Sequence, residues 1–393
     1  MERIGIYGGT FNPPHVGHIQ AAKQAAVSLD LSKLLLIPDR IAPHKVLPEN
    51  SPSPQQRLEM LCIAVKNSPT LEVSDMELRR EGVSYTWETV AALKEQYPES
   101  ELVLLMGTDM FLSFHTWRYP ERITEKASLG VFYRGDKGEI AAIEAQKAQI
   151  EASGVTVYLV KNEITPISST QLRRLLAFGC EDAFLNEGVG EYIRNNGLYD
   201  TAADWKNLPI EQLESIVIRL LNPNRVAHVL GCRDTAVELA RRWGANEVDA
   251  ARAGLLHDIT KALDGPLQLT LCDAYGKILS AFSQKYPKTL HALTGSLVAK
   301  RIFGENDAVV SAIEHHTTGK ADMNLLETII YVADYMEPNR NFPGVEKLRE
   351  LAYSDIQAAL KLGLEMTLEH LNRQGNEVSP ESREALAWLN KEK

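Results

Sequence analysis

The hydrophobic residues in the first half of the chain come in short runs, with longer mixed segments between them. The runs are rich in Val, Ile and Leu, as expected for strands buried on both faces. They are Ile4–Tyr7, Lys33–Ile37, Leu71–Val73, Glu101–Met106, Leu129–Tyr133 and Val155–Val160. The segments between them are long enough for crossover helices. This pattern predicts a doubly wound α/β domain built on a parallel sheet.

The second half of the chain has a helical pattern and no predicted strand. The expected helices are Ile210–Leu221, Arg225–Trp243, Glu247–Leu263, Thr289–Phe303, Asp307–His315, Leu325–Glu337 and Asp355–Gln374. The residues interpreted as helix breakers are Pro223, Gly244, Pro266, Gly304 and Pro338. The short polar segment 200–204 precedes this half. We therefore predict two domains, residues 1–200 and an all-α domain of residues 205–393.

Composition and charge narrow the functional classes. The chain has 393 residues, with 42 Lys and Arg against 52 Asp and Glu, a formal net charge of −10. This acidic balance argues against a nucleic-acid partner, although a local basic pocket remains compatible with it. No apolar run is long enough for a membrane span, and no signal peptide is evident. The four cysteines are scattered, which favours reduced thiols in a cytoplasmic protein and disfavours a structural cysteine-zinc site. The oligomeric state, including a homo-oligomer, stays open.

The first candidate site follows the first predicted strand. The string GGTFNPPHVGH contains Gly8, Gly9, His15 and His18 and leads into a helical run. Glycines let a ligand approach the backbone, and a helix N-terminus attracts anions. The string matches neither the dinucleotide-binding fingerprint nor the Walker A pattern. Two histidines three residues apart can bind oxygens of one phosphate chain, so we predict a phosphate site.

These strings resemble the nucleotidylyltransferase superfamily. Its (H/T)xGH motif matches His15–His18, and its ISSTxxR motif matches Ile167–Arg173, with Leu172 in place of the usual Ile. Within it, the chain is most similar to the bacterial nicotinate-mononucleotide adenylyltransferases over about residues 1–200. Further matching strings are PHK (43–45), SYTWET (84–89), MGTD (106–109) and FHTW (114–117).

The resemblance implies transfer of AMP from ATP to nicotinate mononucleotide, giving deamido-NAD and pyrophosphate, with Mg²⁺ on the ATP. It implies catalytic contacts to the ATP phosphates from His15, His18, Lys45 and Arg173. Trp117 would stack on the pyridine ring, and amides near Tyr85 and Thr86 would face its carboxylate. The residues expected in the nucleotide pocket are Gly8, Gly9, Thr10, Phe11, His44, Tyr85, Thr86, Gly107, Asp109, Trp117, Ile167, Ser168, Ser169 and Thr170.

The second candidate site gathers histidines and aspartates in the helical half. Asp334 follows an Ile-Ile-Tyr-Val-Ala run, so its carboxylate is expected to point inward, where an unpaired charge is costly. His257 and Asp258 are adjacent, after an Ala/Gly/Leu-rich segment expected to be helical. A metal ion would relieve the cost of these buried charges. Imidazole and carboxylate ligands without thiolates suit Fe, Mn or Zn.

The pattern H…HD…D resembles the HD-domain phosphohydrolases. The pattern is most similar to the YqeK family, which cleaves diadenosine tetraphosphate symmetrically into two ADP. The matching strings are RVAHV (225–229), GLLHDITK (254–261), HTTG (316–319), YVAD (331–334) and EPNR (337–340). The resemblance implies a first metal on His228, His257, Asp258 and Asp334. A second metal would be held by His291 and His316, with Asp258 as the bridge. His315 stays an open alternative to His316.

The same resemblance implies roles around the two metals. They would activate a water near neutral pH. Asp258 and Lys261 would be catalytic, Lys261 and Arg340 would neutralise the phosphate chain, and Thr317, Thr318 and Gly319 would face the nucleotide.

Two alternatives accompany these assignments. The first domain could be another adenylyltransferase, such as pantetheine-phosphate adenylyltransferase, which shares (H/T)xGH; the SYTWET and FHTW strings speak against it. The helical domain could act on another nucleotide phosphate, or could sense nucleotides without hydrolysing them. The complete ligand set disfavours a sensor.

Overall fold

The computed structural model describes residues 2–43, 46–48, 50–133, 137–162 and 167–391. By the contacts among its residues the chain divides into two units, residues 1–203 and residues 204–393. Each unit is described by itself. None of the helices among the described residues is long and apolar enough to cross a membrane.

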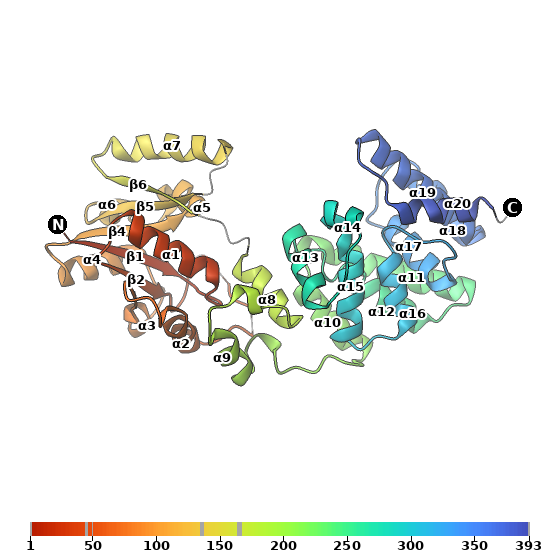
Figure 1. The fold of residues 1–393 in the computed structure, drawn as a ribbon, viewed down its shortest axis with the longest axis horizontal. Helices are drawn as coiled ribbons and strands as arrows, with labels where there is room; N and C mark the ends of the chain where they lie inside the picture. Colours follow the sequence, from red (N-terminus) through yellow and green to blue (C-terminus); the bar gives the residue numbers. More distant parts are fainter. Residues whose placement is uncertain (1, 44–45, 49, 134–136, 163–166, 392–393) are drawn as a thin grey trace. The chain divides into compact units, whose positions relative to one another are not determined.

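A six-stranded parallel sheet forms the centre of the first unit (Figure 1). Its strands are β1 (Arg3–Gly9), β2 (Lys33–Pro38), β3 (Leu71–Val73), β4 (Glu101–Gly107), β5 (Ala127–Tyr133) and β6 (Val157–Lys161). Their order in the sheet is β3-β2-β1-β4-β5-β6, and every neighbouring pair is parallel. The doubly wound α/β class predicted from the hydrophobic runs is confirmed.

Helices connect these strands, and two further helices of the unit, α8 and α9, follow the last strand. They are α1 (Val16–Ser28), α2 (Pro54–Val65), α3 (Met76–Arg79), α4 (Thr86–Gln96), α5 (Thr108–Leu112), α6 (Pro120–Thr124), α7 (Lys137–Glu151), α8 (Ser169–Ala177) and α9 (Val189–Asn195), with 3-10 turns at Phe114–Thr116, Asp182–Phe184 and Leu198–Asp200. In Figure 1, α1 lies in front of the strands. A core cluster joins Ile4 and Leu104 of the sheet to Val90 of α4, Phe111 of α5 and Ile143 of α7.

The strand order determines where a ligand can enter this sheet. The chain starts at β1 in the centre and winds outward in both directions, so the connections after β1 and β4 leave the sheet on opposite faces. Ligands of such sheets bind at the carboxyl ends of the strands at this reversal. The GGTFNPPH segment begins with the last two residues of β1, and Gly107 ends β4, with Thr108 and Asp109 following it.

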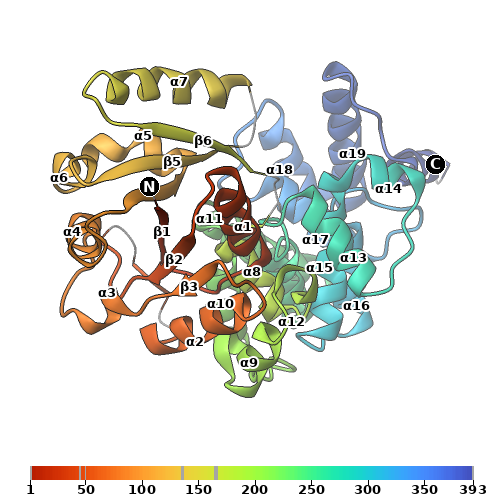
Figure 2. The same cartoon turned by 60° about the vertical axis from the view of Figure 1, so that its left-hand side comes forward.

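The described residues of the second unit form helices joined by turns and loops, and none of them forms a strand. Its helices are α10 (Ile210–Leu220), α11 (Val226–Trp243), α12 (Glu247–Leu256), α13 (Gly265–Ala274), α14 (Ala281–Lys285), α15 (Leu290–Arg301), α16 (Asp307–His315), α17 (Leu325–Met336), α18 (Val345–Ser354), α19 (Ile356–Arg373) and α20 (Pro380–Leu389), with 3-10 turns at Pro223–Arg225 and Pro287–Thr289. Figure 2 shows α11, α12, α15, α16 and α17 grouped together, and contacts between these helices agree with that view.

Two predictions for this unit were wrong. The helix expected over Glu247–Leu263 ends at Leu256, and turns follow it, so His257 and Asp258 lie just after α12 rather than on it. Pro266, interpreted as a breaker, lies in the first turn of α13. A proline is tolerated there because the first N–H groups of a helix have no intrahelical partner. The short helices α13, α14, α18 and α20 were not predicted.

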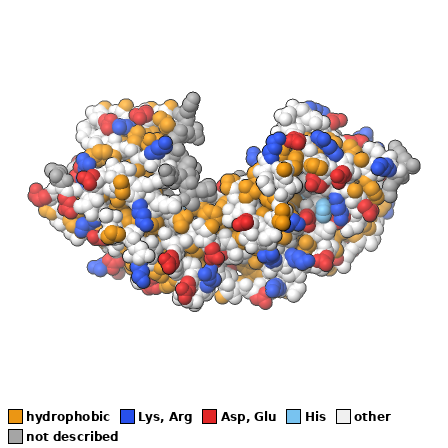
Figure 3. Space-filling model, in the orientation of Figure 1, with side chains coloured by type: hydrophobic (Ala, Val, Ile, Leu, Met, Phe, Trp, Pro, Cys, Tyr) orange, Lys and Arg blue, Asp and Glu red, His pale blue; other side chains and the backbone are white. Residues whose placement is uncertain are grey.

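Charged side chains of both signs are interspersed on the face of each unit drawn in Figure 3. That face shows no broad basic region of the kind that holds nucleic acid.

Candidate functional site

The two histidines of the first motif lie together at the start of α1. His15 is the residue before the helix, and its ring lies 3.6 Å from the ring of His18 between centroids. The backbone N–H of His15 donates to His18 Nδ1 at 3.3 Å. The buried Nδ1 of His15 has no hydrogen-bond partner among the described residues. Burial lowers the pKa of His15 to about 4, so this imidazole is neutral near pH 7.

The second motif contacts the first although about 150 residues separate them. Ser169 Oγ donates to Pro13 O at 3.1 Å. The Arg173 guanidinium donates to Asn12 O at 2.8 Å and to Thr170 Oγ1 at 3.1 Å. Ser168 caps the N-terminus of α8 by accepting from the N–H of Gln171. The N-termini of α1 and α8 are thus joined through one loop, and both offer free N–H groups that attract anions.

Buried side chains also hydrogen-bond to the loop between Gly9 and His15. The fully buried Arg57 donates to Thr10 O at 2.6 Å and to Asp39 O at 2.7 Å. Tyr199 donates to Asn12 Oδ1 at 2.7 Å. These bonds fix the backbone that lies between the glycines and the histidines.

A cavity of about 330 Å³ opens beside the histidine pair. Five predicted site residues line it: His15, His18, Gly107, Asp109 and Ile167. The further lining residues, which the sequence did not reveal, are Tyr7, Gly17, Ala21, Thr108, Met110, Phe132, Tyr133, Glu139 and Asn162. The volume lies within the range of small-molecule sites.

The segments expected to bind the acceptor ring lie together, but not on the lining of this cavity. The guanidinium carbon of Arg118 lies 4.5 Å from the centre of the Tyr85 ring, and Trp87 and Tyr119 pack edge to face at 5.6 Å. Trp117 is half-buried, 5.3 Å from the Phe114 ring and against the core cluster. Thr86 begins α4.

The other predicted residues of this site fall into two groups. Gly8 and Gly9 end β1, and the buried Phe11 places its ring 5.2 Å from that of His18. Phe11 has a φ of 46°, which turns the chain sharply after the glycines. His44 and Lys45 lie outside the described residues, so their predicted roles rest on the sequence.

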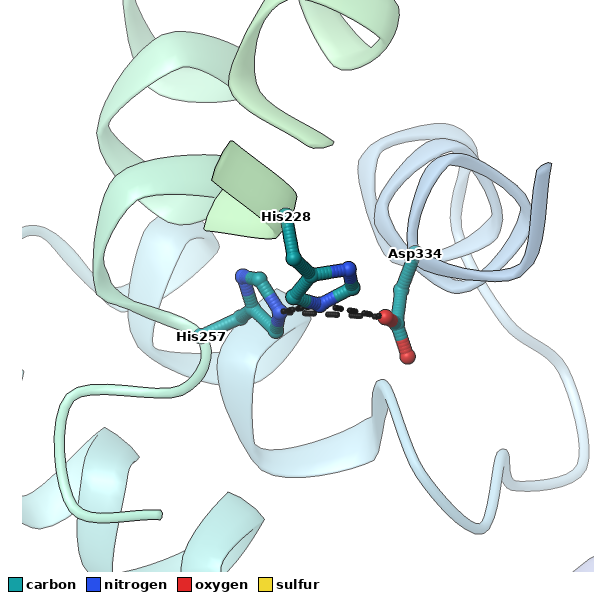
Figure 4. A group of neighbouring side chains, drawn as sticks. All are labelled: His228, His257 and Asp334. Atoms are coloured by element: carbon teal, nitrogen blue, oxygen red, sulfur yellow. Dashed lines mark hydrogen bonds and ion pairs between the residues drawn. The ribbon is translucent and has the colours of Figure 1, made fainter. Parts of the chain in front are cut away.

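The second site brings together four histidines and two aspartates from five parts of the second unit. His228 lies on α11, His257 and Asp258 follow α12, His291 lies on α15, His316 follows α16 and Asp334 lies on α17. The Nε2 atom of His228 lies 3.2 Å from His257 Nε2 and 3.1 Å from Asp334 Oδ1 (Figure 4). All four imidazoles are buried, and Asp334 is partly exposed.

Asp258 lies in the middle of this cluster and faces two pairs of histidines. Its Oδ2 is 3.6 Å from His228 Nε2 and 3.5 Å from His257 Nε2. Its Oδ1 is 3.5 Å from His291 Nε2 and 3.8 Å from His316 Nε2. Two groups of ligand atoms close enough for a metal ion share His257: one with His228 and Asp334, the other with Asp258 and His316.

Hydrogen bonds of Nδ1 to backbone carbonyls orient three of the four imidazoles. His257 Nδ1 lies 2.7 Å from Gly254 O, His291 Nδ1 lies 3.0 Å from Lys288 O, and His316 Nδ1 lies 2.7 Å from Ile313 O. A carbonyl can only accept, so each Nδ1 carries the hydrogen and each Nε2 keeps a lone pair for the centre of the cluster. Burial lowers the pKa of His257 and His291 well below the usual value, and that of His316 to about 4. Neutral imidazoles are the form that binds metals.

Three cationic side chains surround the cluster. Arg225 contacts Asp258, and Arg340 Nη2 lies 2.6 Å from Asp334 Oδ1. Lys261 Nζ lies 2.8 Å from His291 Nε2. Arg225 was not predicted, although it lies within the matched string that contains His228.

The structure also distinguishes the neighbouring residues 315–319. His316 faces Asp258, whereas His315 Nδ1 bonds to Ser311 O at 2.8 Å and lies 4.0 Å from Glu327. Thr317 Oγ1 lies 3.1 Å from Nε2 of both His291 and His316, so it reaches the cluster itself. Thr318 O accepts from Ser382, and Gly319 is buried near Met323 and Leu364.

The donor set fits divalent metal ions. Neutral imidazole nitrogens and carboxylate oxygens converge without a thiolate, and a cation would offset the charge of the buried Asp258.

Two family models match different parts of the chain. A Cytidylyltransferase-like family model matches residues 6–175, and an HD domain model matches residues 225–339. An HD domain implies a divalent metal site, and the histidine and aspartate cluster lies inside the matched range.

Three of the similar proteins each match about half of this chain. A probable nicotinate-nucleotide adenylyltransferase from Borreliella afzelii is 34% identical over 50% of this chain and 96% of its own length. Another, from Desulfatibacillum aliphaticivorans, is 37% identical over 50% of this chain and 99% of its own length. A solved structure from Clostridium acetobutylicum, described as a predicted HD superfamily hydrolase involved in NAD metabolism, is 35% identical over 47% of this chain and 99% of that chain, with a TM-score of 0.46.

The match over nearly the whole length of the adenylyltransferase relatives settles the family. Through its first unit the chain belongs to the nicotinate-nucleotide adenylyltransferase family, and its second unit contains an HD domain.

Proposed function

We propose that the first unit transfers AMP from ATP to nicotinate mononucleotide, giving deamido-NAD and pyrophosphate. The observation that carries this proposal is the junction of the two motifs, where Ser169 and Arg173 bind the backbone of Pro13 and Asn12. The histidine pair lines one cavity together with Ile167, which lies two residues before α8. The family of the chain supplies the substrate class.

The reaction needs positioning rather than a protein nucleophile. A phosphate oxygen of the mononucleotide attacks the α-phosphorus of ATP, and the bond to the β-phosphate oxygen breaks in line. His18 and the neutral His15 donate hydrogen bonds to the phosphate oxygens. Lys45 and Arg173 balance the charge that accumulates on the leaving pyrophosphate, which Mg²⁺ accompanies. Ser168, Ser169 and Thr170 line the same end.

The acceptor occupies the side of the site nearer to β4. Asp109 holds the ribose, Trp117 stacks on the pyridine ring, and the amides near Tyr85 and Thr86 bind its carboxylate. The packing of Arg118 on Tyr85 supports this assignment, because it links the two segments that would hold the ring.

Acceptor preference tests this part. Purified full-length protein with ATP and Mg²⁺ is given nicotinate mononucleotide, nicotinamide mononucleotide or phosphopantetheine in separate reactions, and products are separated by chromatography. We expect deamido-NAD as the main product. Turnover of phosphopantetheine alone would favour the pantetheine-phosphate adenylyltransferase alternative and overturn the assignment.

We propose that the second unit hydrolyses diadenosine tetraphosphate symmetrically to two ADP at a site for two metal ions. The observation that carries this proposal is Asp258, whose two carboxylate oxygens face different histidine pairs. His228, His257, Asp258 and Asp334 would hold one metal, and His291, His316 and Asp258 the other. Bound divalent metals, with Fe, Mn and Zn as candidates, would make a water nucleophilic near neutral pH.

The surrounding side chains bind the substrate. Arg225, Lys261 and Arg340 provide positive charge for a chain of phosphates, and Thr317 hydrogen-bonds beside it. Addition of one water breaks the central phosphoanhydride bond and leaves two phosphates on each adenosine.

Metal analysis and product analysis separate this activity from nucleotide sensing. Full-length protein is stripped of metal, resupplied with Mg²⁺, Mn²⁺, Fe²⁺ or Zn²⁺, and incubated with diadenosine tetraphosphate. We expect bound metal and ADP as the only nucleotide product with at least one transition metal. Protein that takes up none of the resupplied metals and binds the dinucleotide without releasing ADP would favour the sensor, and equal amounts of ATP and AMP would contradict symmetrical cleavage.

A further inference from the structure

His228 is oriented differently from the other histidines of the cluster. The Nδ1 atoms of His257, His291 and His316 lie against backbone carbonyls. His228 Nδ1 instead lies 3.1 Å from Oε1 of Glu337, a residue that was not assigned a role from the sequence. Glu337 follows the last turn of α17 and is 1% exposed.

The carboxyl group of Glu337 is held on its other side by Asn339. Its Oε2 accepts from the backbone N–H of Asn339 at 2.7 Å and from Asn339 Nδ2 at 2.8 Å. Asn339 Nδ2 also donates to Ala227 O, at 3.0 Å, in the first turn of α11. With two N–H donors on Oε2, the carboxyl group acts as an acceptor, so His228 Nδ1 donates to it and His228 Nε2 is the ring nitrogen that faces the cluster.

Helix α11 leaves room for this carboxyl group. Gly231 lies one turn after His228, and a Cβ there would come within 3.0 Å of Glu337 Oε2 and 3.1 Å from Asn339 Nδ2. A side chain at position 231 would therefore displace the group that orients His228. Gly231 leaves space for Glu337, Asn339 donates hydrogen bonds to Glu337, and Glu337 contacts the His228 ring.

We propose that Glu337 is a positioning residue that fixes the tautomer and ring orientation of His228 for metal binding. The inference rests on the metal site of the proposed function. A carboxylate on the far nitrogen of a metal-binding histidine also makes the near nitrogen a stronger ligand, and loss of such a partner weakens metal binding by roughly 10- to 100-fold. If Glu337 served stability alone, its replacement would lower the unfolding temperature and leave metal affinity unchanged.

The test measures Mn²⁺ affinity, without substrate, in the metal-stripped full chain by calorimetric titration. Glu337→Gln is expected to weaken Mn²⁺ binding by roughly 10- to 100-fold. Gly231→Ala is expected to weaken it as well, because it displaces the carboxyl group. Asn339→Ala, at an exposed position, is expected to give a smaller loss and serves if the first two variants fold poorly.

The matched control is Glu327→Gln on α17. Glu327 is also fully buried but binds Ser311, Lys320 and Asn324 rather than a residue of the cluster. It is expected to change the unfolding temperature and not the Mn²⁺ affinity.

Two results would overturn the inference in different ways. Wild-type protein that binds Mn²⁺ with the same affinity as Glu337→Gln and Asn339→Ala would refute the role of Glu337 and leave the metal site standing. Wild-type protein that binds no Mn²⁺, Fe²⁺ or Zn²⁺ would refute the metal site and the inference together.

Discussion

His15 shows how burial sets the chemistry of a single residue. Its pKa falls from 6.5 to about 4 because desolvation disfavours the charged imidazole, and its Nδ1 has no partner among the described residues. The unfolded chain therefore takes up a proton below about pH 6.5 that the folded unit takes up only near pH 4. Above pH 6.5 His15 is neutral in both states and does not lower the free energy of unfolding. As the pH falls from 6.5 towards 4, protonation of the unfolded chain lowers the free energy of unfolding by a total of about 3 kcal/mol.

This prediction can be checked on full-length protein with isotope-labelled histidine. The ring signal that disappears in His15→Gln is expected to keep the chemical shift of a neutral imidazole down to pH 5. A midpoint near pH 6.5 for that signal would contradict the burial argument.

Tyr199 offers a second residue-scale test. Its hydroxyl is buried and donates to Asn12 Oδ1, so Tyr199→Phe leaves that oxygen without this donor. We expect a loss of about 1–3 kcal/mol in the stability of the first unit, measured by calorimetry. Tyr192→Phe, which removes an exposed bond to Glu59, is the control, with an expected change within about 0.5 kcal/mol. Equal effects of the two variants would show that burial of the bond does not matter.

At this scale the sequence revealed the chemistry but not the partners. Motifs in the sequence contain His15, His18 and the six proposed metal ligands. The structure brings the members of each set together. Arg57 has no such signal, because its role depends on which loops the fold brings beside it. Glu337 and Arg225 do lie inside matched strings. Their charge and their position three residues from His228 or Asp334 could have indicated a role at the metal site.

Among the elements, the contact between α11 and α12 positions His228 relative to His257. A Cβ on Gly254 would lie 2.7 Å from Arg233 Cα, which is backbone and cannot move aside easily. We expect Gly254→Ala to destabilise the second unit by about 1–3 kcal/mol, measured by urea unfolding.

Gly363 provides the matched control for that substitution. A Cβ there would meet only the side chain of Tyr331, at 3.2 Å, within α19. The gain in helix propensity of roughly 1 kcal/mol offsets that contact, so Gly363→Ala should be near neutral. A Gly254→Ala variant as stable as Gly363→Ala would show that the two helices can separate without cost.

The elements themselves were predictable to different degrees. All six strands were found, because buried parallel strands are short apolar runs bounded by polar segments. The end of α12 was misplaced by seven residues, from Leu263 to Leu256, because the apolar pattern continues through the turns that carry His257 and Asp258. Pro266 was misinterpreted because a proline marks a helix start as readily as a break.

For the whole molecule, each proposed site is built entirely within one unit. The phosphate site uses residues between Tyr7 and Arg173, and the metal cluster uses residues between Arg225 and Arg340. We therefore expect two activities that single substitutions can remove separately.

The most direct test assays both activities in full-length wild type, His18→Ala and Asp258→Ala. With ATP and nicotinate mononucleotide, His18→Ala should lose deamido-NAD formation by roughly 100-fold or more and keep the release of ADP from diadenosine tetraphosphate. Asp258→Ala should show the reverse. If either substitution removes both activities, or if wild-type protein releases no ADP, the claim of two separate sites, one forming and one cleaving phosphoanhydride bonds, is contradicted.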